Sequence, residues 1–307
     1  QFKKYKLEDV VDIIMGQSPE GATCNKNNKG VPLLNGPTEF GDKFPTAVQY
    51  TTDPKKFSEV GDILFCVRGS TTGRMNFSDR RYAIGRGLAA IRHKKGKHLQ
   101  SFVKGLIDTI LPGMLQNVTG STFPNLSKEQ LNNYEVEIPE DLPTQTRIAS
   151  ILSSLDDKIE LNRRTNHTLE QMAQTLFKKY FVDDIDPESL PEGWRWGKLG
   201  EMYKTTSGGT PSRTIPEYFE GGNIGWVKSK ELDGGFILDT EEKITRDALK
   251  SSSAKLLPVH SVLVAMYGAT VGEIAILSIE ATCNQAICAI LPNEVYAYSF
   301  VFLFLQL

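Results

Sequence analysis

A short loop that occurs twice in the sequence carries the residue types best suited to binding. Residues 68–74 read RGSTTGR and residues 267–273 read YGATVGE, and each loop follows an apolar run. The two glycines of each loop, four residues apart, supply positive φ and let the backbone approach another surface. Hydroxyl groups beside arginine can hydrogen-bond to phosphate oxygens. An ordinary turn explains either loop alone. However, both copies keep the two glycines and the preceding apolar run and differ in the exposed residues, which favours a role in binding.

Two further loops are shared in the same way. Gly16–Pro19 corresponds to Gly208–Ser212. Val31–Phe40 corresponds to Ile224–Leu232, and in each copy an apolar strand leads into polar residues. The polar residues in these loops are of the types that read base edges in the major groove of DNA. Turn chemistry explains Asn35 equally well, because a glycine follows it.

These loops belong to a long internal repeat. Residues 6–91 reappear in order at 198–290, for example with Ile84–Ile91 opposite Cys283–Ile290. The apolar positions and the glycines are shared, whereas the polar and charged positions differ. Gene duplication followed by change of the exposed residues predicts two copies of one scaffold, each presenting different chemistry.

Charge is distributed unevenly along the chain. The 307 residues have a net charge of −2, yet residues 68–97 hold nine Lys/Arg and one acid, Asp79. Residues 1–141 hold 19 Lys/Arg against 16 Asp/Glu, and residues 182–307 hold 10 against 17. A phosphate backbone responds to such a local patch more than to the global charge. A solvated basic face is the alternative interpretation.

No catalytic constellation is found in the sequence. No GxGxxG follows a predicted strand, no P-loop occurs, and the Asn/Asp-Pro-Pro-aromatic loop of an amino-methyltransferase is absent. The four histidines, His93, His98, His167 and His260, lack metal-ligand or triad spacing. The sequence therefore favours a chain without catalytic residues, a metal site or a cofactor of its own.

The four cysteines do not form a motif. Cys283 and Cys288 are predicted in one strand with side chains on opposite faces, and Cys24 and Cys66 have no motif spacing. Reduced, mostly buried thiols are typical of a cytoplasmic protein. The apolar run at 296–307 is too short to span a membrane, so we expect no membrane partner.

Residues 143–181 form one long predicted helix. They contain no glycine, and mostly apolar residues recur with alternating gaps of four and three over about five heptads, which is the seam of a coiled coil. Two asparagines in the middle of the seam weaken it and can fix the register. At 1.5 Å per residue the helix is roughly 55 Å long, which favours a partner helix over packing on its own domain alone. The residues expected to pack against a partner helix are Ile148, Leu152, Leu155, Ile159, Asn162, Asn166, Leu169 and Leu176.

The segments on either side of this helix are predicted to be α/β domains. The expected strands lie at Val31–Leu34, Ile63–Val67, Leu88–Ile91 and Tyr134–Ile138, with a helix at Leu99–Leu111. The predicted boundaries are residues 1–141 for the first domain, 142–182 for the spacer helix and 183–307 for the second domain. The second copy lacks counterparts of the last strand and long helix of the first, so we expect it to be incomplete at its C-terminus.

With these motifs in place, the chain resembles the DNA-specificity (S) subunit of Type I restriction–modification systems. The resemblance rests on GSTFPNLSKEQL at Gly120–Leu131, on the long segment Gln145–Phe181, which contains Leu155-Asp156, and on LPEGWRWGKLGE at Leu190–Glu201. It covers nearly the whole chain.

The resemblance implies an architecture and a set of partners. The fold would be two similar α/β target-recognition domains joined by a long α-helix of coiled-coil type, each domain reading one half of a split site in double-stranded DNA. The helix would act as a ruler and dock two methyltransferase subunits. Those subunits carry S-adenosylmethionine and methylate adenine, and ATP-dependent restriction subunits complete the enzyme. This chain departs from the family in lacking a second long helix.

The residue patterns and the resemblance together give a set of candidate contact residues. The side chains expected to contact DNA are Gln17, Ser18, Asn35, Thr38, Arg68, Ser70, Thr71, Arg74, Arg81, Arg86, Thr210, Ser212, Lys228, Lys230, Tyr267 and Thr270. Three alternatives stay open at this point: a specificity subunit or domain of a Type II system with similar recognition domains, a nuclease acting alone, and a protein-interaction module built on the long helix.

Overall fold

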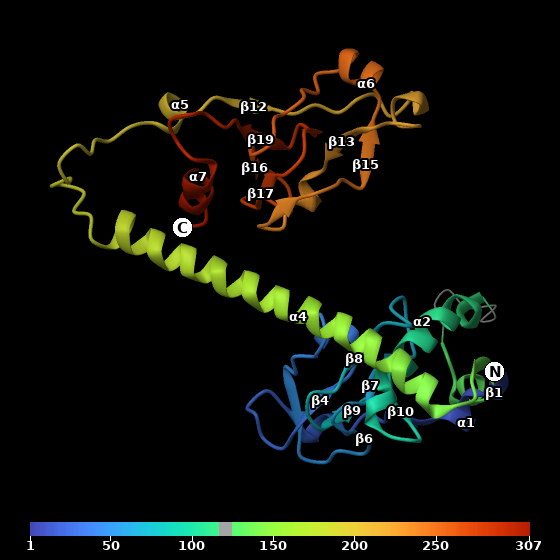
Figure 1. The fold of residues 1–307 in the computed structure, drawn as a ribbon. Helices are drawn as coiled ribbons and strands as arrows, with labels where there is room; N and C mark the ends of the chain where they lie inside the picture. Colours follow the sequence, from blue (N-terminus) through green and yellow to red (C-terminus); the bar gives the residue numbers. More distant parts are fainter. Residues whose placement is uncertain (117–124) are drawn as a thin grey trace. The chain divides into compact units, whose positions relative to one another are not determined.

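The structure is a computed structural model that describes residues 1–116 and 125–307. The part of the GSTFPNLSKEQL motif at residues 120–124 lies outside the described residues. The chain divides into two compact units, Gln1–Thr165 (unit 1) and Asn166–Leu307 (unit 2), with the division inside one long helix (Figure 1). Each unit is described by itself.

Unit 1 is built on three β-sheets. The central sheet is antiparallel and contains, in spatial order, β2 (Val11–Met15), β10 (Leu88–His93), β7 (Ile63–Cys66) and β8 (Met75–Phe77). The second sheet contains, in order, β3 (Cys24–Asn25), β5 (Gln49–Thr51), β4 (Val31–Leu34), β9 (Tyr82–Ile84) and β6 (Phe57–Ser58), with β4 parallel to β9. The strands predicted around residues 31, 63 and 88 are confirmed.

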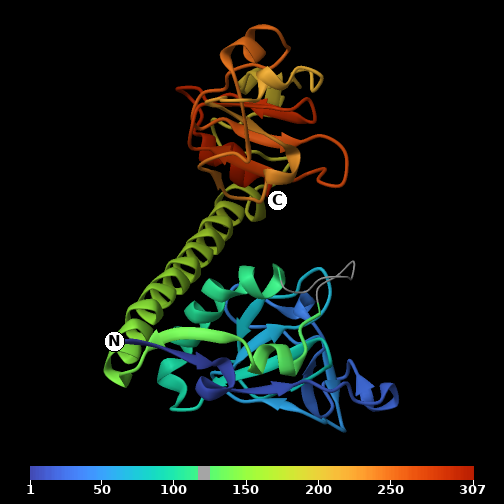
Figure 2. The same ribbon diagram turned by 90° about the vertical axis from the view of Figure 1, so that its right-hand side faces the viewer.

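The third sheet of unit 1 joins its N-terminal strand to a strand near residue 140. β1 (Phe2–Lys6) pairs antiparallel with β11 (Glu135–Pro139), so segments from the two ends of the first 141 residues lie side by side (Figure 2). The helices of this region are α1 (Leu7–Val10), α2 (Gln100–Gln116) and α3 (Lys128–Asn132). Side chains from α2, such as Phe102 and Ile107, bury themselves in the main core of the unit because that helix is apolar on one face.

The long helix α4 (Leu142–Lys178) has 37 residues and continues into a π-helical turn at Lys179–Asp183. Pro143 lies in its first turn, where a missing N–H breaks no intrahelical bond. Its first turns belong to unit 1, since Ala149 is fully buried in the unit 1 core and Ile148 packs against it. The predicted long helix is confirmed.

Unit 2 repeats the scheme of unit 1. Its larger sheet contains, in order, β12 (Thr205–Ser207), β19 (Ile287–Ile290), β16 (Val262–Ala265), β17 (Ile274–Leu277) and β14 (Phe236–Ile237). Its smaller sheet contains β15 (Glu242–Ile244), β13 (Ile224–Val227) and β18 (Ala281–Cys283). The helices are α5 (Leu199–Met202), α6 (Arg246–Lys250) and α7 (Tyr298–Leu305).

The strand pairs that the two units share have the same register, residue for residue. β13 is parallel to β18 as β4 is to β9, and β16 lies between β17 and β19 as β7 lies between β8 and β10. The equivalent cross-strand pairs are Ile14–Ala90 and Thr206–Ala289, Phe65–Ala89 and Val264–Cys288, Ile63–Phe77 and Val262–Ile276, and Leu33–Ala83 and Trp226–Thr282. The predicted fold class, two similar α/β domains joined by a long helix, is confirmed.

The cysteine prediction needs a correction. Cys283 ends β18 and Cys288 lies in β19, so the two residues are not in one strand as expected. A turn that begins at the polar residue Asn284 separates the two strands. The sequence did not reveal this turn because apolar residues continue on both sides of it. Burial raises the pKa of the Cys283 thiol to about 12, so this thiol stays protonated. Among the described residues no cluster of three metal-ligating side chains occurs, and no described helix is long and apolar enough to cross a membrane.

Candidate nucleic-acid interface

Three loops of unit 1 meet at the turn between β9 and β10. The Gly85 N–H donates to the carbonyl of Leu34 (2.8 Å), and the Gln17 N–H donates to the carbonyl at the end of β9 (2.9 Å). From the third loop, the Val67 N–H donates to the carbonyl of Gly87 (2.9 Å). Backbone hydrogen bonds thus hold the polar residues after β2, β4 and β7 around one turn.

Arg86 is at the tip of this turn. It is exposed, and its N–H donates to the Ser18 hydroxyl (3.2 Å). The flanking glycines leave room for Asn35, because a Cβ on Gly85 or on Gly87 would lie 2.5 Å from an Asn35 oxygen. We call the exposed residues gathered here the unit 1 loop cluster: Gln17, Ser18, Asn35, Arg68 and Arg86.

Unit 2 builds the same meeting point between β18 and β19. The Asn284 N–H donates to Val227 (2.9 Å), the Gly209 N–H donates to the end of β18 (2.9 Å), and the Met266 N–H donates to Ala286 (2.8 Å). The exposed Gln285 stands at the tip, where unit 1 has its arginine. The unit 2 loop cluster consists of Thr210, Lys228, Tyr267 and Gln285.

The duplicated glycine loops have the backbone that the sequence predicts. Gly69 and Gly73 have φ of 90° and 96°, and Gly268 and Gly272 have φ of 90° and 89°, which confirms positive φ at all four positions. In unit 1 the loop presents Ser70 to solvent, while Thr71 and its counterpart Thr270 are half-buried.

Three arginines of unit 1 are exposed and form no ion pair with any described residue. Arg68, Arg74 and Arg86 are exposed, and none of the three has a carboxylate partner among the described residues. Arg81 differs, because it lies at the opposite end of β9 from the loop cluster, pairs with Glu59 (3.1 Å) and stacks over Phe57 (3.7 Å). The structure therefore does not bring Arg81 into the cluster.

Unit 2 neutralises the two lysines that were expected to contact DNA. The Lys228 Nζ pairs with Glu241 (2.8 Å) and Glu242 (2.7 Å), and Lys230 pairs with Glu241 (2.7 Å). Arg213 completes the network with a 2.6 Å contact to Glu242. The two carboxylates raise the pKa of Lys228, and hydrogen bonds from Arg213 and then Lys228 lower the pKa of Glu242 to about 2. Lys228 and Lys230 are thus engaged within the unit.

The remaining candidates make local contacts. The Thr38 hydroxyl donates to Glu39 (3.0 Å), and the Ser212 hydroxyl shares a hydrogen bond with Thr214 (2.8 Å). The Thr210 hydroxyl donates to the Gln285 side chain. Gln285 was not among the candidates from sequence, although the alignment of Ile84–Ile91 with the second copy already placed it opposite the arginine.

The predicted seam of α4 divides into a packed part and an exposed part. Ile148 and Leu152 face unit 1, where the Leu152 Cδ1 fills the space beside Gly105. Farther along, Leu155 is 58% exposed and Leu176 is 52% exposed. The other exposed members of the seam are Ile159, Asn162, Asn166 and Leu169.

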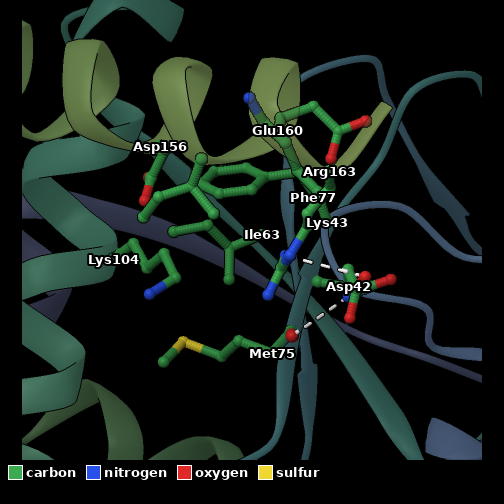
Figure 3. Close-up of a pocket in the computed structure, with 11 residues that line it drawn as sticks. Asp42, Lys43, Ile63, Met75, Phe77, Lys104, Asp156, Glu160 and Arg163 are labelled. Atoms are coloured by element: carbon green, nitrogen blue, oxygen red, sulfur yellow. Dashed lines mark hydrogen bonds and ion pairs between the residues drawn. The ribbon is translucent and has the colours of Figure 1, made fainter. Parts of the chain in front are cut away.

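Charged side chains fasten the helix to unit 1 at a small cavity of about 70 Å³ (Figure 3). The Lys43 Nζ lies 2.7 Å from Asp157, and Arg163 lies 3.7 Å from Asp42. The cavity is lined by apolar and charged residues of both sides, among them Ile63 and Met75 of the sheet and Ile159, Glu160 and Arg163 of the helix. Its position and its small size fit a helix-to-sheet contact.

Comparisons with known proteins agree with this duplicated architecture. The profile of the Type I restriction modification DNA specificity domain matches residues 1–171 and 191–307. The specificity subunit of the HindI type I restriction enzyme of Haemophilus influenzae is 25% identical over 327 residues, covering 82% of this chain and 71% of that protein. The MjaIX specificity subunit of Methanocaldococcus jannaschii is 36% identical over 169 residues, covering 50% of this chain.

The chain spans only part of its relatives, since that match covers 38% of the M. jannaschii protein. A crystal structure of a Type I restriction–modification S subunit from M. genitalium superposes with a TM-score of 0.60 at 17% identity, covering 100% of this chain and 76% of the other. At that identity the likeness concerns the fold.

Proposed function

This chain belongs to the family of Type I restriction modification DNA specificity domains, and from that premise we propose that it reads DNA sequence for a restriction–modification assembly without catalysing a reaction itself. The observation that carries the proposal is the repeated frame. Two units with the same strand registers and the same backbone bonds present different side chains at one equivalent surface. Such a pair suits a site with two unlike halves.

The domain assignment follows from this reading. We place the target-recognition domains at residues 1–141 and 183–307, with the spacer helix at 142–182 between them. The free guanidinium groups of unit 1 suit phosphate oxygens and base edges, because arginine donates in a planar fork. The neutralisation of Lys228 and Lys230 in unit 2 supports fewer phosphate contacts at that loop cluster.

The partners proposed are those that the family implies. Two methyltransferase subunits would supply S-adenosylmethionine and methylate adenine, and ATP-dependent restriction subunits would complete the complex. The apolar stripe left exposed on α4 supports docking of other helices, since large exposed apolar surfaces mark interaction sites. The helix would also set the distance between the two halves of the site.

Binding measurements on the assembly with methyltransferase subunits test the proposal. Affinity for double-stranded DNA should fall steeply as salt rises, because phosphate contacts release counterions. Arg74→Ala should weaken binding to all sequences and lower the slope of log K against log salt by about one. Arg80→Ala is the matched control, since Arg80 is engaged by the neighbouring Asp79 (3.3 Å).

The isolated chain provides the second arm of the test. With DNA, Mg²⁺ and S-adenosylmethionine it should give neither cleaved nor methylated DNA, whereas the assembly should methylate adenine. Product formed by the isolated chain, or DNA affinity that does not respond to salt, would contradict the proposal.

A further inference from the structure

We propose that Arg86 and Gln285 are the equivalent base-reading residues of the two units, Arg86 selecting a guanine in one half-site and Gln285 an adenine in the other. This inference rests on the proposed function and names the specificity that each unit would have. It is carried by the position of the two side chains, by how firmly their turns are held and by their chemistry.

The two residues occupy the same place in the duplicated frame. Each lies second in a four-residue turn that closes with an N–H to carbonyl bond, from Leu88 to Gly85 (3.0 Å) and from Ile287 to Asn284 (3.3 Å). The strands that enter and leave the two turns pair in identical register. If one turn contacts DNA, the equivalent turn of the other unit is placed to make the equivalent contact.

Backbone bonds from three neighbouring loops hold each turn in place. Besides the three already described, the Gly16 N–H donates to Leu88 (2.8 Å), and the Gly208 N–H donates to Ile287 (3.3 Å). A Cβ on Gly16 would lie 2.1 Å from the carbonyl oxygen of Gly85, and a Cβ on Gly208 would lie 2.4 Å from that of Asn284, so the backbones are in direct contact. A tip held this firmly loses little conformational freedom on binding, which favours selective contacts.

The side chains at the tips are those with a two-point match to a purine. Arginine donates both hydrogen bonds to O6 and N7 of guanine, and glutamine donates to N7 and accepts from N6 of adenine. Arg86 is exposed without a carboxylate partner among the described residues. In unit 2 the Thr210 hydroxyl donates to the Gln285 side-chain oxygen, which orients the amide. The NH₂ group and the second lone pair of that oxygen remain for the two contacts to adenine.

Two other long side chains near the turns, one in each unit, are already engaged. Asn35 donates its amide to Gln49 (3.0 Å), and Lys228 is held by two carboxylates. The loops that follow β2 and β12 contribute Ser18 and Thr210. Ser18 accepts a hydrogen bond from the backbone N–H of Arg86, and Thr210 donates one to the Gln285 side chain, so both act as positioning residues. Among the side chains that remain available, Arg86 and Gln285 are the ones at the tips of the turns, whereas Arg68 lies in a neighbouring loop.

Selection of bound fragments from a random duplex library, with the chain assembled with its methyltransferase subunits, tests this inference. The wild-type assembly should enrich a two-part motif with an invariant G·C pair in one half and an invariant A·T pair in the other. Arg86→Ala should relax that G·C pair alone, lowering discrimination there roughly 10- to 100-fold. Gln285→Ala should relax the A·T pair alone by a similar factor.

Exchange variants and controls separate the possible failures. Arg86→Lys keeps the charge but loses the two-point fork, so it should retain DNA affinity and still lose the guanine preference. Arg86→Gln should shift the preference at that position towards adenine without altering the other half-site, and Arg80→Ala should leave both halves unchanged. All selections are repeated at low salt, where phosphate contacts keep weakened variants bound.

The outcomes are distinct. If the wild-type assembly enriches no motif, the proposed function fails. If it enriches a motif that Arg86→Ala and Gln285→Ala leave unchanged, the function stands and the assignment of these two residues is overturned. A change that falls on bases other than G and A, or in both halves at once, also overturns it.

Discussion

At the scale of single residues, Gly16 and Gly208 are among the glycines least able to accept a side chain. Because a Cβ on Gly16 would lie 2.1 Å from the carbonyl oxygen of Gly85, the backbone must move. Gly16→Ala should destabilise unit 1 by about 2–3 kcal/mol, as overpacking does. Thermal or urea unfolding measures the change. Gly21→Ala is the control, since nothing lies within 4 Å of its Cβ, and equal losses in the two variants would refute the steric account.

Glu242 makes unit 2 sensitive to acid. Arg213 and Lys228 hold its pKa at about 2, below the ordinary value of 4.5, so the carboxylate stabilises the folded unit fully above pH 4.5. That contribution disappears as the pH falls towards 2. Glu242→Gln should cost about 1 kcal/mol at pH 7, since solvent screens much of the attraction, and should flatten the decline in stability below pH 4.5. An unchanged acid profile of unfolding would contradict the assignment.

Some residue-level features could be predicted from sequence and others could not. Positive φ at Gly69 and Gly73 followed from glycine spacing, because that conformation is a local property. The engagement of Lys228 did not, since its partners come from a different segment, 13 and 14 residues later. Gln285 was missed because an amide stands out less than a cluster of arginines.

At the scale of elements, α4 serves two purposes along one seam. Leu152 fills space beside Gly105, whereas Leu155, three residues on, is exposed. Leu152→Ala should therefore destabilise unit 1 by about 1–2 kcal/mol, through lost burial and a partial cavity. Leu155→Ala is the matched control and should leave the unfolding midpoint of the free chain within about 0.5 kcal/mol. Losses of similar size would mean that the packing of the seam is not divided as described.

The helix itself was predictable, but its division was not. A gap pattern of four and three marks an apolar seam over residues 143–181 whichever surface covers it. Leucine and isoleucine serve both kinds of contact, so the sequence could not tell which turns lie on unit 1. The misassigned strand around Cys283 has a similar cause, because apolar residues continue on both sides of a short turn.

At the scale of the whole molecule, the helix length is expected to set the spacing of the DNA site. Four residues inserted between Glu170 and Gln171 add about 6 Å at 1.5 Å per residue, close to two base pairs of roughly 3.4 Å each. In a chain carrying the second helix that the family implies, the insertion should lengthen the unread spacer without changing either half-site. Sequencing of methylated adenines in cells measures both. An active variant with an unchanged spacer would show that the helix is not the ruler.

An exchange of residues 1–141 for the same span of a relative provides the complementary control. It should change one half-site and leave the spacer and the other half as they were. The duplicated architecture behind this expectation was predictable because the repeat preserves apolar positions and glycines, which fix the frame. The bases read by each half were not, because they depend on a few exposed side chains whose partners only the fold brings together.

Genes with an internal duplication can exchange sequence between their two halves. Residues 63–91 and 262–290 are both 29 residues long, and every strand pairing within one stretch has its equivalent in the other. A recombination event that copied one stretch over the other would therefore insert strands already in register. The recipient would keep its fold and acquire the donor's tip residue in a single genetic step. Because the strands around each turn pair in the same register, the residues that face DNA could be exchanged between the two units without loss of the fold.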